Sequence, residues 1–214
     1  MRKQNPKSYE YIESLLPTEN ESMLKSRRGA ESLGLGGISI SAAEGSLVQF
    51  LVGISGAKKA IEIGTLTGLS AQYILKALSP DGQLWTLEKS KQHADLAADA
   101  VNDKRCHIVV GDAQEKLSEL VSKGPFDAIF IDGNKAAYLN YFNWAVENIA
   151  IGGVIVADNV FLAGAVWGDQ SQQKFNEKQV DVVRRMNLKA FSTEALVSTI
   201  IPTEEGLLIC RRVK

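Results

Sequence analysis

The chain is poor in the residues that disulfide, zinc and histidine chemistry require. Its 214 residues include only two cysteines, Cys106 and Cys210, and they form no CxxC pair or Cys/His cluster. We therefore expect two buried, reduced thiols, and the composition excludes a disulfide-stapled scaffold. The two histidines, His93 in the middle of a predicted helix and His107 at the start of a predicted strand, lie away from the expected ligand edge. A catalytic histidine is not expected.

The sequence also lacks an excess of one charge and a long apolar run. Lys and Arg total 24 and Asp and Glu total 25, and this net charge of −1 excludes a protein-wide field for nucleic acid or membrane. The longest uncharged apolar run, residues 149–157, is much shorter than the roughly 20 residues of a membrane span. No apolar core follows the basic residues 1–6, so we expect no signal peptide. Length and composition predict a soluble, cytoplasmic protein with one domain, residues 1–214.

Short apolar segments alternate with helical patterns through the middle of the chain. Residues 59–63, 83–88, 107–110, 126–131 and 153–157 are the expected strands. This alternation predicts a parallel sheet covered by helices on both faces. Residues 196–202 and 207–212 predict two more strands, joined by a Thr-Glu-Glu-Gly turn. The expected fold is therefore a Rossmann-like, doubly wound α/β fold with seven strands, mostly parallel, and a C-terminal antiparallel hairpin.

The first 40 residues are polar and helical in pattern. Pro6 is expected to open one helix and Pro17 to end it, and residues 18–21 are typical of a capping box for a second helix that Gly29 would stop. A glycine-rich loop follows over residues 30–40. Another capping box at residues 41–44 opens a helix that should run to Gly56.

Acidic residues stand at the expected ligand edge, where the carboxyl ends of parallel strands meet. Each of the five strands delivers one: Glu62, Glu88, Asp112, Asp132 and Asp158. After the second strand, an acid suits a ribose diol or caps the next helix.

The loop after the first strand carries Gly64 and Gly68 but matches neither GxGxxG nor GxxxxGK[ST]. Either the glycines only allow a tight turn, or they allow the backbone to approach a ligand.

Oxygen-rich side chains end the fourth and fifth strands. Asp132, Asp158 and Asn159 suit Mg²⁺, Mn²⁺ or Ca²⁺ better than Zn²⁺, although they are also common turn residues. Lys135, three residues after Asp132, is a candidate general base or else a solvated lysine at a helix start.

Together, segments 62–70, 111–113, 130–135 and 158–160, with Glu88, resemble the cation-dependent class I O-methyltransferases. These are the caffeoyl-CoA and catechol O-methyltransferase relatives, including small bacterial members, and the likeness runs from about residue 41 to the C-terminus. The resemblance implies S-adenosylmethionine and a divalent cation (Mg, Mn or Ca) as cofactors, with residues 41–214 as the cofactor-binding core. It also implies a homodimer, with residues 1–40 as a lid and dimer contact.

The resemblance assigns roles by motif position. The implied cofactor-binding residues are Ile40, Glu62, Gly64, Thr65, Ser70, Glu88, Asp112, Ala113, Asp132, Asn134 and Tyr141. The implied metal ligands are Asp132, Asp158 and Asn159, and Lys135 and Asp132 are the implied catalytic pair.

The sequence departs from the family pattern at three positions. Asn134 replaces a carboxylate near the cofactor's amino group, so we expect weaker cofactor binding. Leu162 and Ala163 stand where relatives often have an aromatic residue and a polar substrate contact, whereas Gly164 and Val166 keep the pattern.

The implied activity is S-adenosylmethionine- and metal-dependent O-methylation of a small catechol-like or phenolic acceptor, free or CoA-linked. Methylation of a hydroxylated uridine in tRNA is an alternative, since Lys25, Arg27 and Arg28 either attract an anionic substrate or form a solvated helix end. Two rivals of other classes are an S-adenosylmethionine-binding protein without turnover and an NAD(P)-dependent oxidoreductase. The missing GxGxxG disfavours the oxidoreductase.

Overall fold

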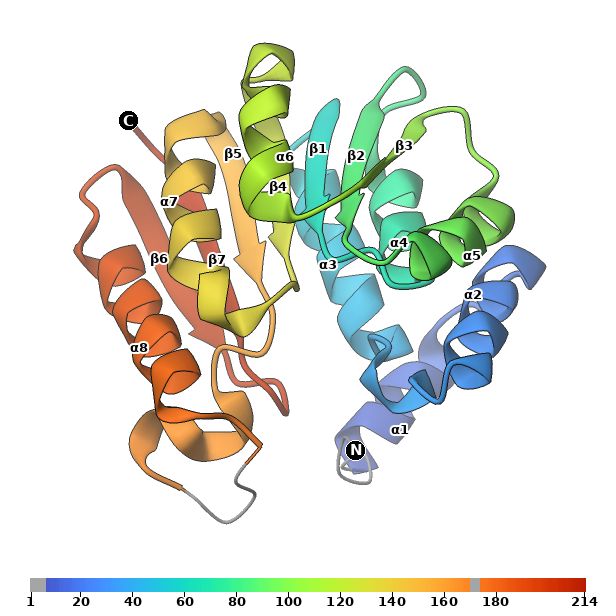
Figure 1. Cartoon of the computed structure of the whole chain (residues 1–214), viewed down its shortest axis with the longest axis horizontal. Helices are drawn as coiled ribbons and strands as arrows, with labels where there is room; N and C mark the ends of the chain where they lie inside the picture. Colours follow the sequence, from blue (N-terminus) through green and yellow to red (C-terminus); the bar gives the residue numbers. More distant parts are fainter. Residues whose placement is uncertain (1–6, 170–173) are drawn as a thin grey trace.

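A single mixed sheet of seven strands organises the chain (Figure 1). The computed structural model describes residues 7–169 and 174–214. The strands are β1 (Lys59–Ile63), β2 (Gln83–Glu88), β3 (Cys106–Val110), β4 (Phe126–Ile131), β5 (Ile149–Ala157), β6 (Leu196–Ile201) and β7 (Leu207–Arg212), in the order β3-β2-β1-β4-β5-β7-β6. The first five run parallel, and β7 is antiparallel to β5 and β6. The predicted fold class is confirmed.

Helices cover both faces of this sheet. They are α1 (Lys7–Leu15), α2 (Glu21–Ser32), α3 (Ala42–Ile54), α4 (Leu69–Ala77), α5 (Lys91–Val101), α6 (Ala113–Leu120), α7 (Tyr138–Asn148) and α8 (Glu177–Ser192). Four 3₁₀ segments join them: η1 (Gly36–Ile38), η2 (Val121–Lys123), η3 (Lys135–Ala137) and η4 (Leu162–Trp167). One core cluster joins the sheet to α6, α7 and α8, and the other joins it to α2, α3 and α4. The apolar strands are therefore buried on both sides, as the near-continuous apolar runs predict.

Two predictions for the N-terminal helices have different outcomes. The capping box of α3 is confirmed, because the Ser41 side chain accepts from the Glu44 amide and the Glu44 carboxylate accepts from the Ser41 amide. The prediction for α2 is wrong at both ends: its N-cap is Asn20 rather than residue 18 of the expected capping box, and the helix continues past Gly29 to Ser32. Gly29 lies inside the helix, where a Cβ would be 3.3 Å from Thr67 Cγ2, so this glycine lets α2 pack closely. The expected helix start at Pro6 lies outside the described residues.

The order of the strands reverses between β1 and β4, which creates a switch point at the carboxyl ends of the strands. Ile131 pairs with both Ile63 and Ala157, so the residues that follow these three lie side by side. The Asp132 amide donates to Ile63 O at 2.9 Å, and the Asp158 amide donates to Ile131 O at 3.0 Å. The two carboxylates predicted to meet thus follow adjacent, hydrogen-bonded strand ends.

Some details of the core extend the sequence-based expectations. β5 begins at Ile149 rather than 153, because the chain pairs with Phe126 before a register shift. Both cysteines are free; Cys210 is buried as expected, whereas Cys106 is only half-buried. Burial raises the pKa of the Cys106 thiol to about 12 and that of Cys210 to about 11. Among the described residues, none of the helices has the length and apolar character needed to cross a bilayer.

Candidate active site

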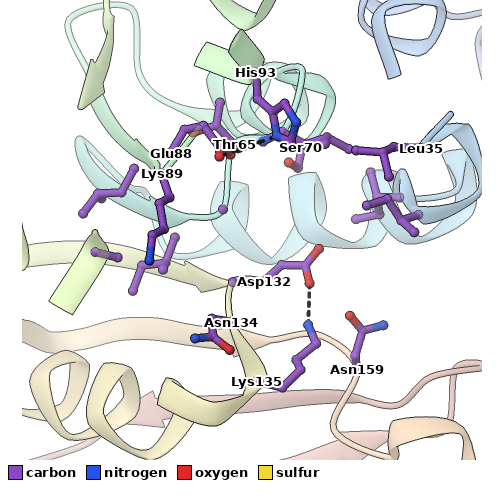
Figure 2. Close-up of a pocket in the computed structure, with 18 of the residues that line it drawn as sticks. Leu35, Thr65, Ser70, Glu88, Lys89, His93, Asp132, Asn134, Lys135 and Asn159 are labelled. Carbon is purple, nitrogen blue, oxygen red and sulfur yellow. Dashed lines mark hydrogen bonds and ion pairs between the residues drawn. The ribbon is translucent and has the colours of Figure 1, made fainter. Parts of the chain in front are cut away.

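A cavity of about 510 Å³ opens at the carboxyl ends of the parallel strands, which is a usual size for a cofactor or drug-sized ligand. Its walls come from the loops after β1, β2, β3, β4 and β5, from η1, and from the turn between β6 and β7. In Figure 2, Thr65, Ser70, Glu88 and His93 lie on one side, and Asp132, Asn134, Lys135 and Asn159 on the other.

The loop between β1 and α4 needs glycine for two reasons. Gly64 has φ +103°, and a Cβ there would stand 2.3 Å from the Asp132 carbonyl oxygen. Gly68 has φ +83°, and its Cβ would stand 2.5 Å from Val101 Cγ2. Gly64 also lines the cavity. The glycines therefore allow the tight turn, and the turn brings the Gly64 backbone to the cavity wall. The close approach of this backbone to a ligand stays a prediction.

Glu88 is fixed at the cavity wall by two backbone amides. Its Oε2 accepts from the Leu66 amide at 2.9 Å, and its Oε1 accepts from the Ser90 amide at 2.8 Å. The N-cap of α5 is the Ser90 side chain, which accepts from the His93 amide. Each carboxylate oxygen can accept a second bond, so Glu88 is oriented and still able to receive hydroxyl donors from the cavity.

The expectation that His93 lies away from the ligand edge is wrong. His93 is in the first turn of α5 and lines the cavity, with Nδ1 3.6 Å from Glu88 Oε1. The sequence signal was the N-cap at Ser90, which places residue 93 at the third helical position rather than in mid-helix. His107 stacks on Trp85 and does not line the cavity, as expected.

Asp112 and Ala113 form the cavity wall at the end of β3. Asp112 is the N-cap of α6, and its carboxylate accepts from the Gln114 amide and from Lys89 Nζ at 3.0 Å. The hydrogen bond from Lys89 keeps the pKa of Asp112 below its ordinary value. The N-terminal amides of α6 and this carboxylate supply both donors and acceptors here.

A hydrogen-bonded group at the cavity wall consists of Asp132, Lys135 and the buried Tyr138. Lys135 Nζ donates to Asp132 Oδ1 at 2.8 Å (Figure 2). It also donates to the Tyr138 hydroxyl at 2.5 Å. The Tyr138 hydroxyl donates to the Asp158 carbonyl oxygen at 3.1 Å. Burial raises the pKa of Tyr138 well above its ordinary value, so the hydroxyl stays protonated. Tyr138 was missed by the sequence reasoning, although its i,i+3 spacing from Lys135 was a usable signal.

The three predicted metal ligands are brought together only in part at the cavity surface. Asp132 and Asn159 line it, whereas Asp158 is fully buried behind the wall, with Oδ1 accepting from the Asn159 amide at 2.7 Å. Within 7–169 and 174–214 there is no cluster of three or more His, Cys, Asp or Glu side chains suited to a metal. The predicted set contains two carboxylates and an amide oxygen, so the absence of such a cluster does not contradict it.

Glu62 lies behind the wall rather than in it. The Thr86 hydroxyl lies 2.5 Å from both Glu62 Oε2 and the Thr65 hydroxyl, and Thr65 lines the cavity. Glu62 Oε1 has no hydrogen-bond partner among the described residues. Burial raises the pKa of Glu62 from 4.5 to about 8, so this carboxyl is largely protonated at neutral pH.

The other residues assigned by resemblance lie at the cavity. Ile40, Ser70, Asn134 and Tyr141 line it, and Asn134 Oδ1 accepts from the Ala136 amide as the cap of η3. Three further lining residues, Lys174, Phe175 and Glu205, were missed, because no motif relates the terminal hairpin or the start of α8 to the parallel strands.

The basic residues of α2 do not form a free cationic patch. Lys25 pairs with Asp99 at 2.8 Å, Arg27 makes a bidentate pair with Glu19, and Arg28 pairs with Glu21. Each positive charge thus has an acidic partner, which weakens the field available to an anionic substrate.

Known proteins similar to this chain are O-methyltransferases. Residues 14–213 match a family described as O-methyltransferase. A catechol O-methyltransferase of Niastella koreensis is 35% identical over 197 residues, covering 89% of this chain and 87% of that protein. A caffeoyl-CoA O-methyltransferase of Medicago sativa is 29% identical, covering 96% and 88%. The crystal structure of an O-methyltransferase from Bacillus cereus in complex with SAH superposes with a TM-score of 0.87, 28% identity and 97% coverage of both chains.

Proposed function

Because the chain belongs to the O-methyltransferase family, with catechol and caffeoyl-CoA O-methyltransferases among its relatives, we propose that its cavity binds S-adenosylmethionine. We further propose that it methylates a hydroxyl of a small phenolic or catechol-like acceptor, free or CoA-linked, with a divalent cation. The observation that carries this proposal is that Asp132 and Asp158 follow adjacent strand ends, where Asp132 lines the cavity hydrogen-bonded to Lys135 and Asp158 lies buried behind the wall.

The cavity suits a cationic nucleoside. Three carboxylates line it beside the ends of β2, β3 and β4: Glu88, Asp112 and Asp132. Lys89 and Lys135 pair with the last two, so Glu88 supplies the negative charge that favours a positively charged sulfur. Glu88 is held by two amides in a position to accept from ribose hydroxyls, and Asp112 and Ala113 would flank the adenine. The remaining cofactor-binding residues in this proposal are Ile40, Gly64, Thr65, Ser70, Asn134 and Tyr141, with Glu62 acting from behind through Thr86 and Thr65. When bound, the cofactor supplies a methyl group on a cationic sulfur.

The oxygen atoms that follow β4 and β5 suit a hard divalent cation. Asp132, Asp158 and Asn159 would hold Mg²⁺, Mn²⁺ or Ca²⁺, since all three offer oxygen. When bound, the cation supplies charge that lowers the pKa of an acceptor hydroxyl from the phenol value of about 10.

The residue of this chain that would take up the acceptor's proton is Lys135, which Tyr138 holds in place. Lys135 Nζ would receive the acceptor proton, because it is held between the Asp132 carboxylate and the Tyr138 hydroxyl at the cavity. A cation on Asp132 disfavours a second positive charge beside it, which suits this role. The fixed positions of these groups supply orientation.

A binding and turnover experiment tests the proposal. Calorimetric titration with S-adenosylmethionine should show one site, and the protein should methylate catechol or a caffeoyl ester in the presence of Mg²⁺. EDTA should abolish transfer and added Mg²⁺ should restore it. Full activity in EDTA would reject the metal role, and NADH binding without S-adenosylmethionine binding would reject the cofactor. Lys135→Met, which keeps the side-chain length, should bind the cofactor but not turn over.

We also propose a homodimer formed through α1 and α3. α1 buries none of its residues, and a free helix of nine residues is marginal in water. Tyr11, Leu15, Phe50 and Ile54 are all more than 60% exposed, and Phe50 and Ile54 line a groove of about 550 Å³. Light scattering should give twice the chain mass, and Phe50→Asp should give the monomer.

Fractionation of cells should place the protein in the cytoplasm, a proposal that its two free thiols support.

A further inference from the structure

The backbone after Asp158 has an unusual conformation. Asn159, Leu162 and Ala163 have φ values of +58°, +48° and +51°, and Gly164 follows at +92°. Residues other than glycine adopt this left-handed region at a cost in free energy, so surrounding contacts must hold it. The segment begins at a residue that lines the cavity, and its shape therefore decides how that wall is built.

The turn between β6 and β7 supplies those contacts. The Val160 amide donates to the Gly206 carbonyl oxygen at 3.1 Å, and the Phe161 amide donates to the Glu205 carbonyl oxygen at 2.9 Å. The third bond comes from a side chain, because the Ala163 amide donates to Glu205 Oε2 at 3.1 Å. The turn lies against the segment so closely that a Cβ on Gly206 would be 2.6 Å from the Phe161 ring.

The turn itself is anchored to the N-terminal part of the chain. The Glu204 amide donates to the Tyr9 hydroxyl of α1 at 3.2 Å. The turn thus has fixed partners on one side and the left-handed segment on the other. Glu205 also lines the cavity, so it connects the cavity wall to the left-handed segment.

We infer that Glu205 is a positioning residue, whose carboxylate clamps the Ala163 amide and so keeps segment 159–164 in the shape that forms the acceptor side of the cavity. The assignment of this side of the cavity to the acceptor rests on the proposed function. The hydrogen bond between Glu205 and the Ala163 amide does not depend on that function. Without the carboxylate, the two backbone bonds from the turn and the bond from Asn187 Nδ2 to the Val160 carbonyl oxygen remain, and the Ala163 amide loses its bond to Glu205.

Three variants separate positioning from other roles. Glu205→Gln keeps an oxygen that accepts from the Ala163 amide, whereas Glu205→Ala removes it. Glu204→Ala removes the neighbouring carboxylate of the same turn and serves as the control for charge. Hydrogen exchange of peptides covering residues 160–164, measured by mass spectrometry without ligands, reads the clamp directly. We expect exchange about tenfold faster in Glu205→Ala and near wild-type in the other two, as for loss of one hydrogen bond to a charged group.

Kinetics then test the consequence. Glu205→Ala should raise the KM for a catechol acceptor about tenfold and leave the dissociation constant of S-adenosylmethionine within about twofold. Glu205→Gln should rescue that KM. Unchanged exchange in Glu205→Ala would overturn the clamp, and a KM defect in Glu205→Gln with normal exchange would overturn positioning in favour of direct contact. If the wild-type protein transfers no methyl group, the proposed function fails while the exchange result still decides the clamp.

Discussion

Glu62→Gln should remove a pH dependence of stability that the wild-type protein carries. Glu62 is fully buried, and its burial raises its pKa from 4.5 to about 8. Between these values the folded protein binds more protons at this site than the unfolded chain does. The free energy of unfolding therefore falls as pH rises through this window. A glutamine side chain cannot ionise, so the variant escapes this penalty.

The size of the effect follows from the two pKa values. Each tenfold change in the proton equilibrium is worth 1.36 kcal/mol, so the full penalty above the folded pKa is on the order of 5 kcal/mol. Between pH 5.5 and pH 8.5, the stability of wild type relative to Glu62→Gln should fall by about 3 kcal/mol. A constant offset, such as a buried amide hydrogen without a partner, does not change this slope.

Urea unfolding at several pH values, in EDTA and without cofactor, measures the difference between wild type and variant. Glu147→Gln, which removes an exposed carboxylate from α7, is the matched control and should show a flat difference. A flat difference for Glu62→Gln as well would refute the reasoning, because it would mean that Glu62 carries no ionisation penalty in the folded protein.

Three further substitutions address the cavity. Glu88→Ala should weaken S-adenosylmethionine binding by about tenfold to a hundredfold in calorimetry, since it removes a charged acceptor; unchanged affinity would exclude the ribose contact. Gly64→Ala should destabilise the fold by about 3 kcal/mol or more in urea, because its Cβ would stand 2.3 Å from the Asp132 carbonyl oxygen at φ +103°; a change below about 1 kcal/mol would contradict this. Tyr138→Phe should lower kcat about tenfold at unchanged acceptor KM, because Lys135 loses a 2.5 Å partner; a change in KM alone would count against positioning of Lys135.

The family resemblance carried by the segments at the strand ends is confirmed by the match over residues 14–213. Each of those segments is a continuous run of residues at the end of a strand. Their spacing follows from the lengths of the strands and helices between them, so they can be recognised in a single sequence. The family match decides against an oxidoreductase. The departure at Asn134 lies within one of these segments, and those at Leu162 and Ala163 follow the last of them. Their effect on binding stays a prediction.

Residues contributed by distant segments were not predictable in the same way. Glu205 reaches Ala163 across 42 positions, through the pairing of β7 with β5. His93 enters the cavity because it lies in the first turn of α5, next to the end of β2. A glycine is needed at position 29 because α2 packs closely against Thr67. The sequence of the helix alone does not show this contact.

The sequence by itself determined the seven strands, the mostly parallel sheet and the acidic residues at its ligand edge, since these depend on local periodicity and on strand ends. Only the tertiary structure decided which of these residues face the cavity. Asp132 and Asn159 line it, whereas Glu62 and Asp158 are buried behind it. The physical reason is that side-chain exposure depends on packing between elements, and no interval within one strand or loop encodes that packing.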